Sequence, residues 1–179
     1  MVKSAYSFST KKEKIENHII VVWVDNEAGV LARVIGLFSG RGYNIDSLAV
    51  AEVDKKKNLS RITIATSGTP QVLQQIKLQL GKLIPVHKVA DFPKSKKTLL
   101  REMALLKVVS SKANLEKAKK ICQKYKCIIL DKTEKSFVFE VSALKKEVDE
   151  LIKKLQTMGL ASVSRTGVVA MTKGSKIFI

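Results

Sequence analysis

Apolar residues in the first quarter of the chain follow two different periods. Residues 18–24 are apolar at nearly every position, which is typical of a buried strand, and the run is too short to cross a membrane. After a polar loop at 25–29, apolar residues recur every three to four positions from 30 to 38, as they do on one face of a helix. We therefore expect a strand, a helix that packs on its sheet, and a second strand that begins near Ile45.

The rest of the first half continues this pattern. Residues 45–53 and 61–66 alternate as strands do, with a charged hairpin loop between them. Residues 70–82 have helical spacing behind a proline, and 86–92 supply a fourth strand. The order strand, helix, strand, strand, helix, strand predicts a ferredoxin-like βαββαβ domain with two helices on one face of a four-stranded antiparallel sheet.

The second half repeats the order after a polar, proline-initiated linker at 93–101. We therefore expect an α+β protein of two ferredoxin-like domains: an N-terminal tail at 1–17, a first domain at 18–92 and a second at 102–179. The expected elements of the second domain are strands at 102–109, 127–130, 137–141 and 163–171, and helices at 114–126 and 144–158.

One face of the first sheet has no helix to cover it in this fold. The strand at 18–24 is apolar on both of its sides, so the uncovered side would meet water. Large exposed apolar faces are rare in soluble monomers. We therefore expect a second copy of the chain, or a neighbouring domain, to cover this face.

The net charge of +17 raises the possibility of a nucleic-acid partner. Of the basic residues, 28 are lysine and only 5 are arginine, whereas readers of bases and phosphates favour arginine. Aromatic residues make up only 6%, which disfavours stacking on RNA bases. A ligand-responsive DNA-binding regulator stays as the alternative function, although the sequence contains no helix-turn-helix. The excess charge lies mainly in residues 93–179, which carry +12 against +5 for residues 1–92.

Catalytic and metal-binding patterns are missing from the sequence. Its two histidines, His18 and His87, fall in expected strands away from any nucleophile, and no metal-ligand spacing occurs. The two cysteines, Cys122 and Cys127, are too few for a disulfide framework and fit a reducing cytoplasm. We expect a cytoplasmic, non-enzymatic chain with no catalytic residue, no metal site, no cofactor and no membrane span.

The loop at 25–29 has groups that suit an amino-acid ligand. A helix start presents unpaired backbone N–H groups and a positive dipole end, which attract a carboxylate. Gly29 allows close approach of the ligand, and the Asn26 amide offers both a donor and an acceptor. The alternative is that Asn26 merely caps the helix, and the spacing does not decide between the two.

Several stretches resemble a known family. They are DNEAGVLARVIGLFSGRGYNIDSLAV from Asp25, LSRITIAT from Leu59, VLQQIKLQLGKLIPVHKV from Val72, REMALLKV from Arg101 and SRTGVVA from Ser164. These stretches resemble the regulatory small subunit of acetolactate synthase (acetohydroxyacid synthase), whose first half is an ACT domain. The likeness extends over roughly residues 18–178.

The resemblance implies a partner of a catalytic large subunit that carries thiamine diphosphate, Mg and FAD. The small subunit would activate the large one and confer feedback inhibition by valine, or by leucine or isoleucine. It implies a homodimer through the ACT domains, with the effector bound between the loop after the first strand of one chain and the start of the second strand of the other. The matching residues are Asn26, Gly29, Val30 and Leu31 on one side, and Asn44 and Ile45 on the other.

Overall fold

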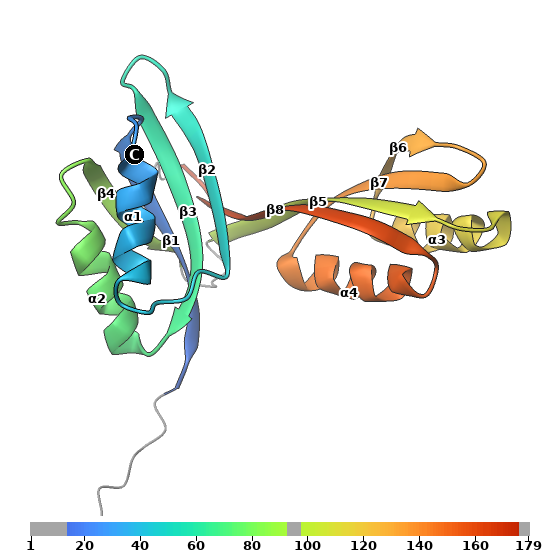
Figure 1. Ribbon diagram of the computed structural model, residues 1–179, viewed down its shortest axis with the longest axis horizontal. Helices are drawn as coiled ribbons and strands as arrows, with labels where there is room; N and C mark the ends of the chain where they lie inside the picture. The colour runs from blue at the N-terminus through green and yellow to red at the C-terminus, as the bar shows by residue number, and fades with distance from the viewer. Residues whose placement is uncertain (1–13, 93–97, 176–179) are drawn as a thin grey trace, which may run out of the picture.

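The structure is a computed structural model that describes residues 14–92 and 98–175 (Figure 1). Most of the expected N-terminal tail, and residues 93–97 of the expected linker, therefore lie outside the described residues. Two bodies are visible, each with a sheet and a pair of helices (Figure 1). No helix of the described residues is long and apolar enough to cross a membrane.

The first body has the predicted order of elements. Its four strands form an antiparallel sheet in the order β2-β3-β1-β4, with both helices on one face. The elements are β1 (Glu16–Asp25), α1 (Val30–Ser39), β2 (Ser47–Asp54), β3 (Leu59–Gly68), α2 (Pro70–Leu80) and β4 (Val86–Phe92). The ferredoxin-like fold predicted for this half is confirmed.

Alternate residues of β1 build the core beneath the two helices. Ile20, Val22 and Val24 are at most 2% exposed and pack with the apolar faces of α1 and α2. The helix residues in this core recur every three to four positions, as the sequence predicted: Val30, Val34, Leu37 and Phe38 on α1, and Leu73, Ile76 and Leu80 on α2.

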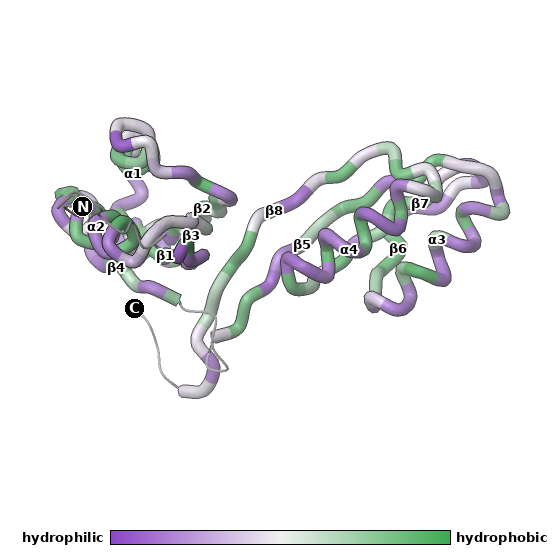
Figure 2. Tube along the Cα trace, turned by 90° about the horizontal axis from the view of Figure 1, so that it is seen from below, coloured by the Kyte–Doolittle hydropathy of each residue, from purple (hydrophilic) through white to green (hydrophobic). Residues whose placement is uncertain are grey.

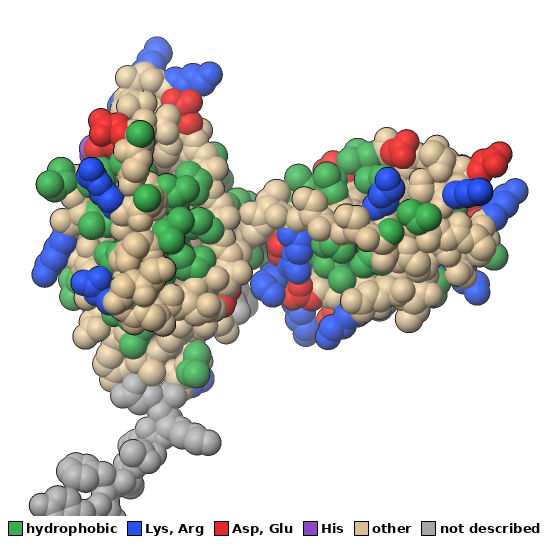
Figure 3. Space-filling model, viewed as in Figure 1, with side chains coloured by type: hydrophobic (Ala, Val, Ile, Leu, Met, Phe, Trp, Pro, Cys, Tyr) green, Lys and Arg blue, Asp and Glu red, His purple; other side chains and the backbone are tan. Residues whose placement is uncertain are grey.

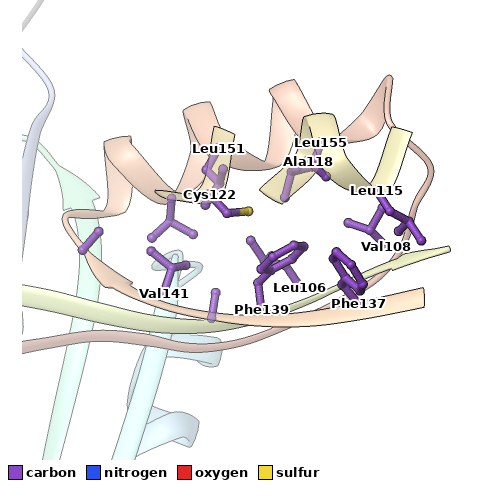
Figure 4. Close-up of a cluster of buried hydrophobic side chains, with 13 residues drawn as sticks. Leu106, Val108, Leu115, Ala118, Cys122, Phe137, Phe139, Val141, Leu151 and Leu155 are labelled. Carbon is purple, nitrogen blue, oxygen red and sulfur yellow. The ribbon is translucent and has the colours of Figure 1, made fainter. Parts of the chain in front are cut away.

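The second body repeats the architecture, with an antiparallel sheet in the order β6-β7-β5-β8. Its buried cluster is drawn in Figure 4, where Phe137 and Phe139 of one strand meet edge to face with ring centroids 5.8 Å apart. The elements are β5 (Thr98–Val109), α3 (Lys112–Lys124), β6 (Ile128–Lys132), β7 (Ser136–Ala143), α4 (Lys145–Gln156) and β8 (Leu160–Thr172). The α+β class with two ferredoxin-like domains is confirmed.

All four strands of the second body are longer than the sequence predicted, and β5 and β8 differ most. β5 begins at Thr98 instead of residue 102, and β8 runs from Leu160 to Thr172 instead of 163–171. The additional residues of β5 pair with the end of β8, with Thr98 opposite Thr172 and Glu102 opposite Val168. These residues were expected to belong to a linker, but pairing with the distant end of β8 places them in a strand.

The paired strands β5 and β8 extend beyond the second body and reach the first sheet (Figures 1 and 2). They contact the face opposite α1 and α2, where Val168 and Ala170 are at most 6% exposed. On the first sheet these side chains meet Ile19, Val21, Trp23, Ala65, Ala90 and Phe92. A neighbouring domain therefore covers this part of the face, which was one of the two expected solutions.

Candidate functional site

The polar loop after β1 lies at the start of α1, as predicted. Gly29 occupies the N-cap position with φ 82°, and a Cβ at this position would meet no atom within 4 Å. Among the described residues, no side chain caps α1 and no acidic residue lies in its first turn. Although the Val30 N–H donates to the Glu27 carbonyl at 3.3 Å, no side chain of the described residues competes for the positive dipole end of the helix, which suits a carboxylate.

Asn26 does not cap α1, so that alternative is wrong. Its backbone N–H donates to the Asn58 carbonyl at 2.7 Å, and its Oδ1 accepts a hydrogen bond from Ser60 Oγ at 2.9 Å. Ser60 is only 4% exposed, so its hydroxyl holds the exposed Asn26 amide in one orientation. With Oδ1 accepting from Ser60, the Nδ2 group is directed away from this bond.

The two apolar residues of this loop differ in exposure. The side chain of Val30 is buried in the core beneath the helices, and its backbone N–H donates to the Glu27 carbonyl at 3.3 Å, so neither group is free to contact a ligand. Leu31 is 37% exposed and presents an apolar side chain at the surface. Of the predicted pair, Leu31 is therefore the residue whose side chain is free to contact a ligand.

The second polar corner lies between α1 and β2. Asn44 is exposed, its Nδ2 donates to Asp46 Oδ1 at 2.6 Å, and its carbonyl accepts from Thr66 Oγ1 at 2.6 Å. Ile45 is half-buried and packs against the core of the first body. These bonds fix the chain at the start of β2.

The two corners do not meet within one chain. They lie at opposite ends of α1, whose ten residues span about 15 Å at 1.5 Å per residue. A ligand as small as an amino acid cannot bridge that length. Each chain therefore presents two separate candidate half-sites.

Asn44 and Ile45 also line a cleft of about 1240 Å³ between the two bodies. The second body contributes four cationic side chains to this cleft: Arg101, Lys145, Lys146 and Lys173. Sequence reasoning did not place these residues near Asn44, because only the pairing of β5 with β8 brings the second body to the first sheet.

The histidines and cysteines have local partners. His18 Nδ1 lies 2.8 Å from Asp91 Oδ2, and His87 Nε2 lies 2.6 Å from Asp25 Oδ1. The hydrogen bond between the Cys122 and Cys127 thiols raises the pKa of Cys122, with burial adding to that shift, and lowers the pKa of Cys127. Within residues 14–92 and 98–175, no group of three or more potential metal ligands occurs.

Comparison with known proteins identifies the family. The model of the "AHAS small subunit-like ACT domain" matches residues 20–88, and that of the "Small subunit of acetolactate synthase" matches residues 101–174. The acetolactate synthase isozyme 3 small subunit of Salmonella typhimurium is 38% identical over 160 residues, which cover 89% of this chain and 97% of that protein. The chain belongs to the family of acetolactate synthase small subunits.

Other relatives agree with this assignment. The probable acetolactate synthase small subunit of Archaeoglobus fulgidus is 36% identical over 159 residues, covering 89% of this chain and 98% of that protein. The crystal structure of the acetolactate synthase small subunit from Thermotoga maritima matches with a TM-score of 0.82 and 30% identity, over 90% of this chain and 99% of that one. The family resemblance and the fold inferred from the sequence are both confirmed.

Proposed function

We propose that this chain is the regulatory, non-catalytic subunit of a cytoplasmic acetolactate synthase, and that it activates the catalytic large subunit and inhibits it when valine is bound. The observation that carries the proposal is the match along both domains to small subunits of this enzyme, over nearly their whole length. Thiamine diphosphate, Mg and FAD are assigned to the large subunit.

The separation of the two half-sites supports an effector site made by two chains. The Asn26–Leu31 side of one chain would face Asn44 and Ile45 of a second copy. Among the described residues, β3 is the strand that pairs with β2 in the sheet, so the other backbone edge of β2 is open to a partner strand. Val50 and Val53 on this strand are 43% and 52% exposed, and Figure 3 shows hydrophobic side chains gathered between α1 and β2. A homodimer through this edge would bury them.

The chemistry of the half-sites suits a branched-chain amino acid. The uncapped start of α1 would receive the carboxylate, and the asparagine amides would accept from the amine. Burial of the side chain contributes about 2 kcal/mol, whereas a millimolar dissociation constant requires about 4 kcal/mol. The polar contacts must therefore supply about half of the affinity.

Calorimetry on the isolated chain tests the sensor role. Valine, leucine and isoleucine are titrated separately, and the strongest of the three is the effector. We expect one valine to bind at each site that is formed by the Asn26–Leu31 side of one chain and by Asn44 and Ile45 of the other. Failure of all three to bind at millimolar concentration would refute the sensor role.

A further inference from the structure

The strand pair β5–β8 contains a β-bulge where it passes from one body to the other. Ala104 pairs with Arg165, but two residues earlier Glu102 pairs with Val168, so β8 has one extra residue here. Thr166 Oγ1 accepts from the Met103 N–H at 3.2 Å. Gly167 has φ +79°, a conformation that side chains disfavour.

The bulge touches the first residue of β2. A Cβ at Gly167 would lie 3.1 Å from Ser47 Cβ and 3.3 Å from Ser47 Oγ, closer than ordinary van der Waals contact. The Val168 N–H also donates to Ser47 Oγ at 3.4 Å. At this point the backbone of β8 in the second body contacts the Ser47 side chain of the first body directly, without a flexible group between them.

Ser47 is joined to the second effector corner by a short, hydrogen-bonded segment. Asn44 is bonded to Asp46 and Thr66, and the Asp46 N–H donates to the Ala65 carbonyl at 2.8 Å. A shift of Asn44 against a ligand is therefore passed to Ser47 through only two intervening residues.

On the other side of the bulge, an ion-pair network leads to α4. Arg165 bonds both oxygens of Glu102, and its Nη1 donates to Asp149 Oδ1 at 2.7 Å. Asp149 also bonds Lys145 at 3.0 Å. A displacement at Gly167 would therefore move Arg165 and, with it, the first turns of α4.

We propose that the contact between Ser47 and Gly167 couples the effector site to the second domain. This coupling proposal rests on the proposed function and deepens that function, because the proposal assigns the transmission of the inhibitory signal to this contact and not to residues 93–97. Effector bound at Asn44 fixes Ser47, Ser47 fixes the bulge, and the bulge sets the position of α4. Such coupling requires a two-state element that both sites bias.

The test compares two glycine substitutions in the full chain reconstituted with its catalytic subunit. Gly167→Ala and Gly174→Ala both place a side chain at φ near +80°, but only the first brings it against Ser47, because a Cβ at Gly174 meets nothing within 4 Å. Ser47→Ala, which removes the acceptor for the Val168 N–H, provides a second variant should Gly167→Ala fail to fold. Calorimetry measures valine affinity, and the synthase assay measures activation and maximal inhibition.

For Gly167→Ala we expect valine affinity and activation within about twofold of wild type, with residual activity at saturating valine raised at least threefold. Amide exchange should show that valine protects α4 in wild type and in Gly174→Ala, but not in Gly167→Ala. Wild-type inhibition and wild-type protection of α4 in Gly167→Ala would overturn the coupling role alone. Absence of valine binding in the wild-type chain would overturn the proposed function, and the coupling role with it.

Discussion

Arg165 of β8 and Glu102 of β5 form a two-pronged ion pair. Arg165 Nε donates to Glu102 Oε1 at 2.7 Å, and Nη2 donates to Oε2 at 2.8 Å. Glu102 is only 3% exposed, and the hydrogen bonds that Arg165 donates to its carboxylate raise the pKa of Arg165. A buried carboxylate that loses such a partner is costly, because its charge is then uncompensated.

Replacement Arg165→Met should therefore destabilise the fold. A fully buried pair costs about 3–5 kcal/mol to break, and the partial exposure of Arg165 lowers our expectation to about 2 kcal/mol. Urea unfolding at pH 7 measures this loss. The control Arg33→Met, at an exposed position, should change stability by less than about 0.5 kcal/mol.

Replacement of either half-site asparagine should reduce sensitivity to valine. A hydrogen bond to a charged group contributes about 1.5–3 kcal/mol, so Asn26→Ala and Asn44→Ala should each raise the valine concentration for half-inhibition at least about tenfold. Activation of the synthase should remain near wild type, because neither change removes a core side chain. Gln74→Ala, at an exposed position of α2, is the control. Full valine sensitivity in both asparagine variants would refute the placement of the site.

Replacement Val50→Lys should dissociate the proposed homodimer. Two lysines brought together at the facing β2 edges repel each other and would be desolvated. Sedimentation at micromolar concentration should show a dimer for wild type and a monomer for the variant. Val109→Lys, on β5 with a similar exposure of 46% against 43%, should remain dimeric. A monomeric wild-type chain would contradict the dimer itself.

Arg61 lies at the interface between the two bodies, and its replacement tests which of its contacts stabilise that interface. Its guanidinium lies 5.2 Å from the Trp23 ring centroid and 5.9 Å from that of Phe92, and it donates to the Ala170 carbonyl. Burial lowers its pKa, and its Nε has no partner. Within the described part of the chain, no carboxylate pairs with it.

The side chain of Arg61 therefore stabilises the interface by packing more than by charge. Arg61→Ala should lower the free energy of unfolding by about 1–3 kcal/mol, since it leaves a gap over Trp23. Arg61→Met keeps most of the volume and removes an uncompensated charge, so it should stay within about 1 kcal/mol of wild type. Chemical unfolding distinguishes the two. An equal loss in both variants would show that the cation–π contact dominates.

Local periodicity was sufficient to predict the order of the twelve elements that the described residues form, because most strands and helices carry their own pattern of buried positions. It failed at Thr98–Arg101 and at the ends of β8, where strand formation depends on pairing between residues about fifty to seventy-five positions apart. For the same reason, the sequence could not predict that β8 crosses the first sheet. The apolar residues on both sides of β1 indicated that another protein surface packs on the uncovered face of the sheet. They could not identify which surface that is.

The candidate site was less predictable from the residues alone. The spacing could not decide whether Asn26 caps α1, and only the Ser60 hydrogen bond and the N-cap position of Gly29 exclude it. The prediction that Asn44 and Ile45 contribute to the site came from the family resemblance. The contact of Ser47 with Gly167 has no local signal, since the two residues come from different domains.

Reconstitution with the catalytic large subunit tests the regulatory role most directly. The large subunit is assayed alone, with this chain, and with this chain plus valine, after the two proteins have been shown to copurify. We predict that the chain raises synthase activity severalfold and that valine reverses the gain, at a concentration that the Asn26→Ala variant shifts upward. A chain that copurifies with no large subunit, or that leaves its activity unchanged with and without valine, would contradict the regulatory role.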